Sequence, residues 1–205
     1  TREGFSLYNR DQDTFSNYFY KENGYKATVT CIAPMNKDYL MLGTTSGVLL
    51  FDIGKERILN DTLPHPLHLL RPTAMVRQSD KIYIGVEKGL YVYSLANGTL
   101  EKLVDMPKAT RIHSVFCQMF TRIWIATEGE GLYMYDTKSK ELKNYRHEDG
   151  YSGLNSNYVR SLAVDQENRL WVGTYGGLNI YEGGKDRFLS VRNSAIQEGL
   201  SLIHI

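Results

Sequence analysis

The sequence lacks the concentrations of charged and of apolar residues that mark several classes of protein. Its 205 residues carry a net charge of +1, and no stretch holds a run of about five like charges. Phosphate binding depends on clustered lysine and arginine, so nucleic acid is disfavoured as a partner. No apolar segment reaches about 18 residues, and the sequence therefore contains no candidate for a membrane-spanning helix.

Catalytic and metal-binding motifs are also missing. The five histidines include His65 and His68, three residues apart, but no carboxylate or further histidine completes a metal set. Residues 150–153 are not a nucleophile elbow, because the strand-to-helix context of that motif is absent. Glu148 and Asp149 lie in a polar loop, whereas a glycosidase needs two carboxylates that converge on one cleft. We therefore predict no catalytic residues, no metal site and no cofactor.

What the sequence does contain is a repeat made of short strands. Residues 170–181 alternate with a period of two on both sides of a glycine turn, and both sides of this ribbon are apolar. This pattern indicates a sheet that is covered on both faces. The same plan occurs at residues 40–51, 82–93 and 123–135.

Turn glycines set the period of this repeat. They are 43, 42, 42 and 46 residues apart, at Gly4, Gly47, Gly89, Gly131 and Gly177. A period in this range built only of strands is typical of β-propeller blades. We predict an all-β fold, a β-propeller of four-stranded antiparallel blades, with about four complete blades and a partial blade at each end. Such a set does not close a ring, so the sequence indicates an incomplete ring that belongs to a larger propeller.

The predicted blades form one propeller segment over residues 1–205. They occupy approximately residues 1–20 (partial), 27–59, 71–103, 111–145, 158–191 and 200–205 (partial). Pro64, Pro66 and Pro72 mark a connection between blades, because proline lacks the donor that a central strand needs. No segment of useful length has the period of a helix. The chain starts inside a repeat, and we expect it to be an excised or processed piece.

Repeat-equivalent positions predict which residues pack between blades. Trp124, Trp171 and Tyr83 occupy one such position, and their recurrence favours packing between neighbouring blades over a platform for stacking sugars. A glycine stands two positions further on in most units, where we expect it to let adjacent backbones approach each other; these residues are Gly43, Gly85 and Gly173.

The two cysteines align with core positions of the repeat. Cys31 matches Ser161, and Cys117 matches Val164. They lie in the first strands of blades that one further blade separates. We therefore predict two free, buried thiols rather than a disulfide or a catalytic pair. Two such cysteines leave the redox compartment open.

Residues 153–178 resemble the two-component regulator propeller repeat. The family pattern is approximately Gly-Leu-Ser-(Ser/His)-Asn-x-Val, a strand, and then Asp-x-x-Gly-x-(Leu/Ile)-Trp-(Ile/Val)-Gly-Thr-x-x-Gly-Leu, and this segment reads GLNSNYVRSLAVDQENRLWVGTYGGL. The third complete unit keeps Trp124 and Gly131, whereas the first two have Met41 and Tyr83 in place of tryptophan. The resemblance spans nearly the whole chain and depends mostly on its second half.

The resemblance implies a sensor. In this family such repeats form the extracytoplasmic sensor of hybrid two-component histidine kinases, common in gut Bacteroidetes, where many recognise fragments of complex glycans. It therefore implies a periplasmic segment, part of an inner-membrane receptor, that binds a small molecule or oligosaccharide and is not itself an enzyme. The implied partners are this ligand, the remaining propeller blades and kinase of the same protein, and a second copy in a homodimer.

Propeller geometry predicts where a ligand would bind. The connections between blades share one face with the turns that join second and third strands. Tyr158 and Tyr175 on this face are suited to stack on a sugar ring, and Arg146 and Arg192 to pair with a carboxylate or sulfate. Ordinary polar loop residues are the competing interpretation for any one of them. The candidate ligand-binding residues are Lys88, Glu128, Arg146, His147, Tyr158, Tyr175, Arg192 and Asn193.

Two alternatives fit the same architecture. A propeller-fold carbohydrate-active hydrolase or lyase would need paired acids in one funnel, and the sequence shows no such cluster. A non-enzymatic scaffold propeller for protein interactions is weakened by the absence of the Gly-His and Trp-Asp pairs of WD repeats and of the paired glycines of kelch repeats.

Overall fold

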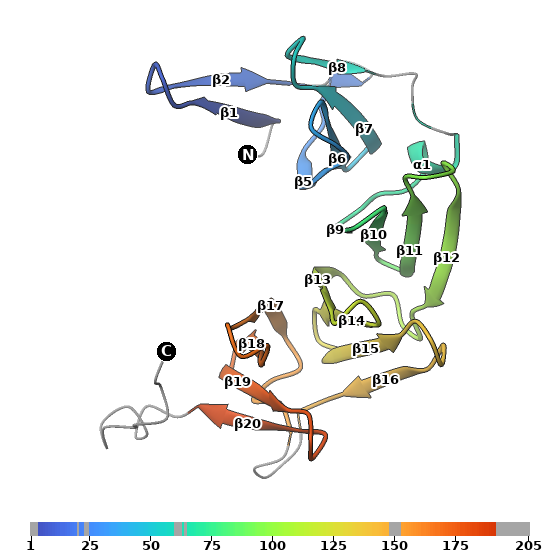
Figure 1. The fold of residues 1–205 in the computed structure, drawn as a ribbon, viewed down its shortest axis with the longest axis vertical. Coiled ribbons are helices and arrows are strands. Elements are labelled where there is room, and N and C mark those ends of the chain that lie inside the picture. The colour runs from blue at the N-terminus through green and yellow to red at the C-terminus, as the bar shows by residue number, and fades with distance from the viewer. Residues whose placement is uncertain are drawn as a thin grey trace. The chain divides into compact units, whose positions relative to one another are not determined.

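The computed structural model describes residues 4–19, 21–22, 25–59, 63, 65–147 and 153–191. The chain divides into two compact units, Thr1–Pro107 and Lys108–Ile205. The described residues form four four-stranded sheets and two two-stranded hairpins, all antiparallel. Each four-stranded sheet is a meander in which consecutive strands pair (Figure 1). The prediction of an all-β fold built from four-stranded propeller blades is confirmed.

Unit 1 contains two blades and the hairpins that precede them. The hairpins pair β1 (Phe5–Asn9) with β2 (Thr14–Tyr18) and β3 (Lys21–Glu22) with β4 (Tyr25–Lys26). The first blade consists of β5 (Val29–Pro34), β6 (Tyr39–Thr44), β7 (Gly47–Asp52) and β8 (Arg57–Leu59). The second blade consists of β9 (Ala74–Gln78), β10 (Lys81–Val86), β11 (Gly89–Ser94) and β12 (Leu100–Asp105).

Both faces of the first blade are buried. Met41 points to the second blade, where it packs in one core with Ile82. Leu42, the next residue of β6, points the other way and packs with Phe51 and with Phe5 of the first hairpin. The rings of Phe5 and Phe51 meet edge to face, with centroids 4.8 Å apart. The apolar character of both sides of the repeat therefore reflects packing on both sides.

The connection between the first two blades contains a helix that the sequence did not predict. α1 (His65–His68) is a single turn, and its Leu67 side chain is fully buried in the core between these blades. Pro66 is tolerated here because the first turn of a helix has no internal partner for its N–H groups. In the described part of the chain, no helix has the length and hydrophobicity needed to cross a membrane.

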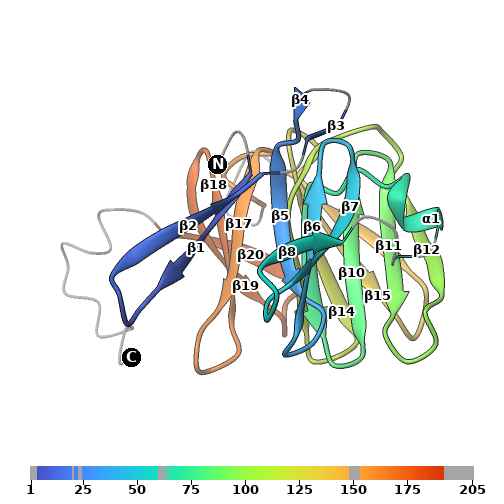
Figure 2. The same ribbon diagram turned by 90° about the horizontal axis from the view of Figure 1, so that it is seen from above.

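Unit 2 contains the third and fourth blades. The third consists of β13 (Ile112–Gln118), β14 (Arg122–Thr127), β15 (Leu132–Asp136) and β16 (Leu142–Tyr145). The fourth consists of β17 (Val159–Val164), β18 (Leu170–Thr174), β19 (Gly177–Glu182) and β20 (Arg187–Val191). Figure 2 shows the strands of the fourth blade side by side, as their pairing requires.

The two tryptophans hold matching places in these blades. Each lies on the second strand of its blade, and each indole donates to a side chain six residues earlier. Trp124 Nε1 donates to Gln118 Oε1 at 2.9 Å, and Trp171 Nε1 donates to Asp165 Oδ2 at 2.8 Å. The predicted equivalence of the two residues is therefore confirmed.

Trp124 is the centre of the core between the third and fourth blades. It is fully buried, and its ring lies 5.0 Å from that of Tyr181 and 6.4 Å from that of Phe188. Trp171 points to the opposite face of the fourth blade and is only half-buried. Leu178, which the register places on the same face, is 38% exposed. The tryptophan position is therefore fully buried at Trp124, where the next blade is described and covers it, and half-buried at Trp171.

A single carboxylate ties the outer strands of these two blades together. Asp186, in the turn before β20, accepts hydrogen bonds from the hydroxyls of Tyr145 (2.6 Å) and Tyr181 (2.8 Å). Lys143 of β16 also donates to it. Two of these donors belong to the third blade and one to the fourth, so Asp186 joins the blades at their outer rim.

The turn glycines are required by a close approach of the backbone. A Cβ atom on Gly89 would lie 2.5 Å from the carbonyl oxygen of Val104, and one on Gly131 would lie 2.3 Å from that of Tyr145. Both carbonyls belong to the outer strand of the same blade. Gly131 also has a φ of +81°, which L side chains rarely adopt. This approach explains the glycine at these two turns, whereas a Cβ on the equivalent Gly47 would meet the carbonyl oxygen of His68 in α1, at 2.3 Å.

The glycines of the second strands make room for a side chain, not for a backbone as we expected. A Cβ on Gly43 would lie 2.5 Å from Cys31 Sγ, and one on Gly173 would lie 2.4 Å from Ser161 Oγ. Cys31 and Ser161 are equivalent residues of the inner strands, as the alignment predicted.

Both cysteines are free, as predicted, but they are half-buried rather than buried. Burial still raises the pKa of Cys31 to about 11 and that of Cys117 to about 12. Neither thiol therefore has the thiolate character of a nucleophile at neutral pH.

Replacing Gly131 with alanine is expected to lower the free energy of unfolding by about 2 kcal/mol or more, because the new Cβ meets a carbonyl oxygen at a strained φ. The matched control is Gly184→Ala, where a Cβ meets nothing within 4 Å. Urea denaturation followed by circular dichroism measures both changes. Equal effects at the two positions would show that the close approach does not limit the side chain at Gly131.

Replacing Trp124 with alanine is expected to cost about 3–5 kcal/mol of unfolding free energy, the range for a large aromatic residue removed from a core. Trp171→Ala, at the equivalent but half-buried position, is expected to cost less than half as much. The same denaturation experiment compares them. A larger loss at Trp171 would mean that this position owes its tryptophan to something other than packing between blades.

Candidate ligand-binding site

A loop of the third blade reaches the connection that enters the fourth blade. Gly129 N and Gly131 N both donate to Asn157 O, at 3.1 and 2.9 Å. Glu128 forms an isolated antiparallel bridge with Tyr158. The loop between β14 and β15 has four residues, whereas the equivalent turns of the first and second blades have two. These bonds place Glu128 beside Tyr158, two of the residues predicted to bind a ligand.

Tyr158 and Tyr175 form a stacked pair. Their ring centroids are 5.5 Å apart, and the planes differ by 8°. Tyr175 lies in the turn between β18 and β19, and its N–H donates to Tyr158 O at 3.0 Å. The side chains remain 46% and 64% exposed. Two predicted residues from different loops therefore form one exposed aromatic surface.

Arg160 extends this surface, and the sequence analysis missed it. Its guanidinium lies 5.1 Å from the centroid of the Tyr175 ring. Arg160 Nη1 donates to His113 Nε2 at 2.8 Å. The His113 ring also approaches Glu128, with Nε2 3.6 Å from Glu128 Oε2. Residues of both blades thus meet in one cluster, and we name these five side chains the aromatic–basic cluster: His113, Glu128, Tyr158, Arg160 and Tyr175.

His113 is held in its neutral form. An arginine has only donors, so the ring nitrogen that faces Arg160 has to accept. Partial burial and then the positive charge of Arg160 lower the pKa of His113 below its usual value, and Arg111 acts in the same direction. Glu128 opposes this effect. The imidazole is therefore an acceptor that orients the arginine.

A β-bulge places both missed residues. The register shifts after Ile112 in the third blade and after Val159 in the fourth, so His113 and Arg160 are the extra residues of equivalent bulges. Bulges re-aim a side chain relative to the sheet. The equivalent residue of the first blade is Thr30, whose hydroxyl lies 2.5 Å from Pro72 O, in the connection to the second blade, and 3.0 Å from Gly43 O of its own blade. In the repeat alignment this position changes from threonine in the first blade to histidine in the third and arginine in the fourth, and this change could have identified both residues.

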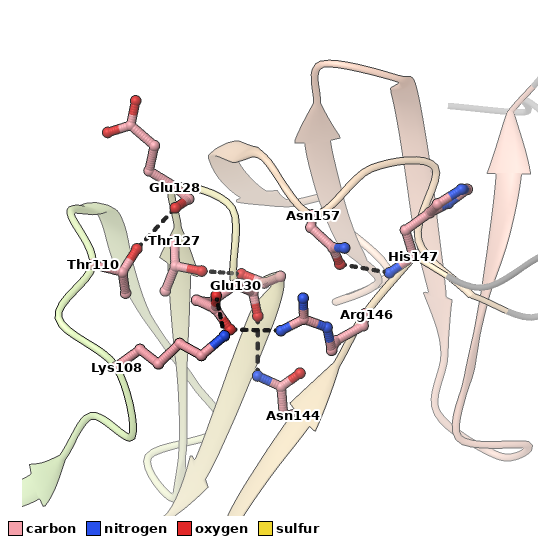
Figure 3. Close-up of polar contacts among 10 residues, drawn as sticks. Lys108, Thr110, Thr127, Glu128, Glu130, Asn144, Arg146, His147 and Asn157 are labelled. Atoms are coloured by element: carbon pink, nitrogen blue, oxygen red, sulfur yellow. Dashed lines mark hydrogen bonds and ion pairs between the residues drawn. The ribbon is translucent and has the colours of Figure 1, made fainter.

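Arg146 and His147 are engaged in contacts that hold the loops. Arg146 Nη1 donates to Glu130 Oε2 at 2.6 Å, and Lys108 Nζ lies 3.2 Å from Glu130 Oε1 (Figure 3). His147 donates its backbone N–H to Asn157 Oδ1 at 2.7 Å. Its ring Nδ1 lies 2.6 Å from the carbonyl oxygen of Leu154. These two predicted residues therefore anchor the connection rather than join the aromatic–basic cluster.

The other predicted residues lie apart from this cluster or outside the described residues. Lys88 belongs to unit 1, where it lines a hollow of about 360 Å³ together with Arg71, Glu87 and the exposed Leu69. Arg192 and Asn193 lie outside the described residues. Within the described ranges, no three His, Cys, Asp or Glu side chains are arranged to hold a metal ion.

The segment that contains β17 and β18 matches the model of a known family. The model of the two-component regulator propeller matches residues 153–176. This segment is a two-component regulator propeller repeat. It supplies Tyr158, Arg160 and Tyr175 of the aromatic–basic cluster. The resemblance seen in the sequence is therefore confirmed for this repeat.

The chain is also similar to a curated protein and to solved structures. The chain is 39% identical over 59 residues to histidine kinase P4 of Formosa agariphila. The aligned residues cover 28% of this chain and 4% of the kinase. Two solved structures share the fold, both described as extracellular domains of hybrid two-component systems from B. thetaiotaomicron. The first is 23% identical to this chain, with a TM-score of 0.74, and the match covers 92% of this chain and 25% of the solved chain. The second is 24% identical, with a TM-score of 0.69, and the match covers 93% of this chain and 26% of the solved chain. The chain thus spans about a quarter of these structures.

Replacing Glu130 with glutamine is expected to weaken the fold most at neutral pH. Hydrogen bonding to Arg146, and less strongly to Lys108, holds the pKa of Glu130 below its ordinary 4.5. A lowered carboxyl pKa stabilises the fold above the ordinary value, and this contribution is lost as the pH falls through the lowered one. Glu130→Gln should therefore lower the melting temperature at about pH 7, and the variant should lose less stability than the wild type between about pH 5 and pH 3.

Thermal denaturation followed by circular dichroism over this pH range measures the effect. The control is Glu101→Gln, at an exposed residue of β12. An unchanged pH profile for Glu130→Gln would show that the contacts with Arg146 and Lys108 do not stabilise the loop.

Proposed function

We propose that the chain is a ligand-sensing segment of the periplasmic domain of a hybrid two-component sensor histidine kinase, and that its ligand is a saccharide. The two-component regulator propeller repeat, the kinase relative and the extracellular domains that share the fold support this proposal. The partners are the ligand and the kinase of the same protein, which receives the signal.

The observation that carries the proposal is the exposed tyrosine stack. A pyranose ring has an apolar face of C–H groups, and an exposed aromatic surface binds such a face while nearby polar groups bind the hydroxyls. Tyr158 and Tyr175 supply the surface. Glu128 and Arg160 supply an acceptor and donors beside it. Hydrophobic stacking and hydrogen bonding are therefore available within one cluster.

The geometry favours binding over turnover. Glycoside hydrolysis requires two carboxylates on opposite sides of the reacting bond. In the aromatic–basic cluster Glu128 is the one carboxylate. Its neighbour Glu130 is held by Arg146 and Lys108, which keeps it ionised and unsuited to act as a general acid. A sensor needs no such pair, because its task is to bind and release an unchanged ligand.

Replacing Tyr175 with alanine is expected to weaken saccharide binding at least about tenfold, because the variant loses the more exposed ring of the stack. Isothermal titration calorimetry against a panel of neutral and acidic oligosaccharides first identifies a bound member and then compares the variant with the wild type. The matched control is Tyr8→Ala, an exposed tyrosine of β1.

Circular dichroism confirms that each protein is folded before titration. If the folded wild type bound no saccharide of the panel, or if Tyr175→Ala and Tyr8→Ala bound with equal affinity, the proposal would be wrong.

A further inference from the structure

The guanidinium of Arg160 is exposed and has spare hydrogen-bonding capacity. Of its five N–H donors, one is used by His113 Nε2. The plane lies over Tyr175, which fixes its position at one side of the stack. Within the described residues, no carboxylate lies within ion-pair distance of it. Three other arginines of unit 2 form ion pairs with carboxylates: Arg146 with Glu130, Arg169 with Asp165 and Arg187 with Glu182.

The site holds this arginine in place without a direct ion pair, and the Glu128 carboxylate approaches it only through the shared contact with His113 Nε2. His113 and Tyr175 are both uncharged contacts, and the lowered pKa keeps the imidazole neutral. A fork of parallel donors on a planar guanidinium matches the two oxygens of a carboxylate or a sulfate. Stacking on a ring restrains the side chain, so less conformational entropy is lost when an anion binds.

The position in the fold also points to a ligand. The equivalent residues of unit 1 are Thr30, which lies in a bulge, and Thr73, which immediately precedes β9; both hydroxyls bond backbone carbonyls, Thr30 those of Pro72 and Gly43 and Thr73 that of Gly85. Arg160 instead contacts side chains, those of His113 and Tyr175. Its side chain leaves the sheet and joins two exposed tyrosines, which is where a bound ring would lie.

We infer that the ligand is an acidic saccharide, and that Arg160 binds its carboxylate or sulfate group while Tyr158 and Tyr175 stack on the sugar. This inference depends on the proposed function and narrows its ligand class. The acid group lies at Arg160 rather than at Arg146, whose charge Glu130 already offsets. Glu128, whose carboxylate approaches the same nitrogen of His113, accepts hydrogen bonds from sugar hydroxyls.

The test compares three tetrasaccharides by calorimetry: tetragalacturonate, a sulfated tetrasaccharide of carrageenan, and neutral cellotetraose. The wild type is expected to bind one acidic probe at least about tenfold more tightly than cellotetraose, because hydrogen bonds to charged groups are the stronger ones. The tighter acidic probe distinguishes a carboxylate from a sulfate. Raising the sodium chloride concentration should weaken binding of that probe but not of cellotetraose.

Variants assign the effect to Arg160. Arg160→Gln should remove the preference for the acidic probe, and Arg160→Lys should retain part of it, because lysine keeps the charge but not the fork. Arg57→Gln is the matched control, an exposed arginine of β8 in unit 1. Melting temperatures within a few degrees of the wild type show that the variants are folded.

The outcomes separate the two levels of the argument. Tyr175-dependent binding of cellotetraose, with equal affinity for the acidic probes or no effect of Arg160→Gln, would refute the acidic ligand and leave the saccharide sensor standing. Failure of the folded wild type to bind any of a full oligosaccharide panel would refute both.

Discussion

The structure depends on burial between neighbouring sheets, because a four-stranded blade cannot hide either of its faces by itself. In unit 1, Met41 and Leu42 are adjacent in the chain and both fully buried, one against the second blade and one against the first hairpin. In unit 2, Trp124 of the third blade is buried against apolar side chains of the fourth blade. The loops that form the candidate site are therefore positioned by contacts made well below them, between apolar side chains of adjacent sheets.

The features that recur in the repeat are those that the sequence could predict. Glycine is required where the outer strand passes too close for a Cβ, as at Gly89 and Gly131, and tryptophan fills the space between blades at Trp124. The features that occur once were missed. α1 forms because Leu67 inserts between two blades, which is a tertiary contact without a local signature. The short pairing of β3 with β4 likewise follows no pattern in the sequence.

The candidate site shows the same division. Glu128, Tyr158 and Tyr175 were predictable, since strand order alone assigns their loops to one face. Arg160 and His113 were not, because strict alternation treats them as ordinary strand residues, and only the bulge turns them toward the tyrosines. The engagement of Arg146 depends on where the Glu130 loop lies, which the sequence does not specify. Which charged side chains form ion pairs depends on the positions of the loops in space. The residue types on one face therefore do not reveal which arginine is left to bind a ligand.

The carboxylate of Asp186 has a mechanical consequence for unit 2. It fastens the outermost strands of two blades, whereas His113 and Arg160 touch across the innermost strands of the same blades. The buried core around Trp124 lies between these two sets of contacts. The third and fourth blades are therefore joined by polar side chains at the outer rim and at the inner edge, and by apolar packing in between, so the candidate site is built on a pair of blades fixed to each other at three levels.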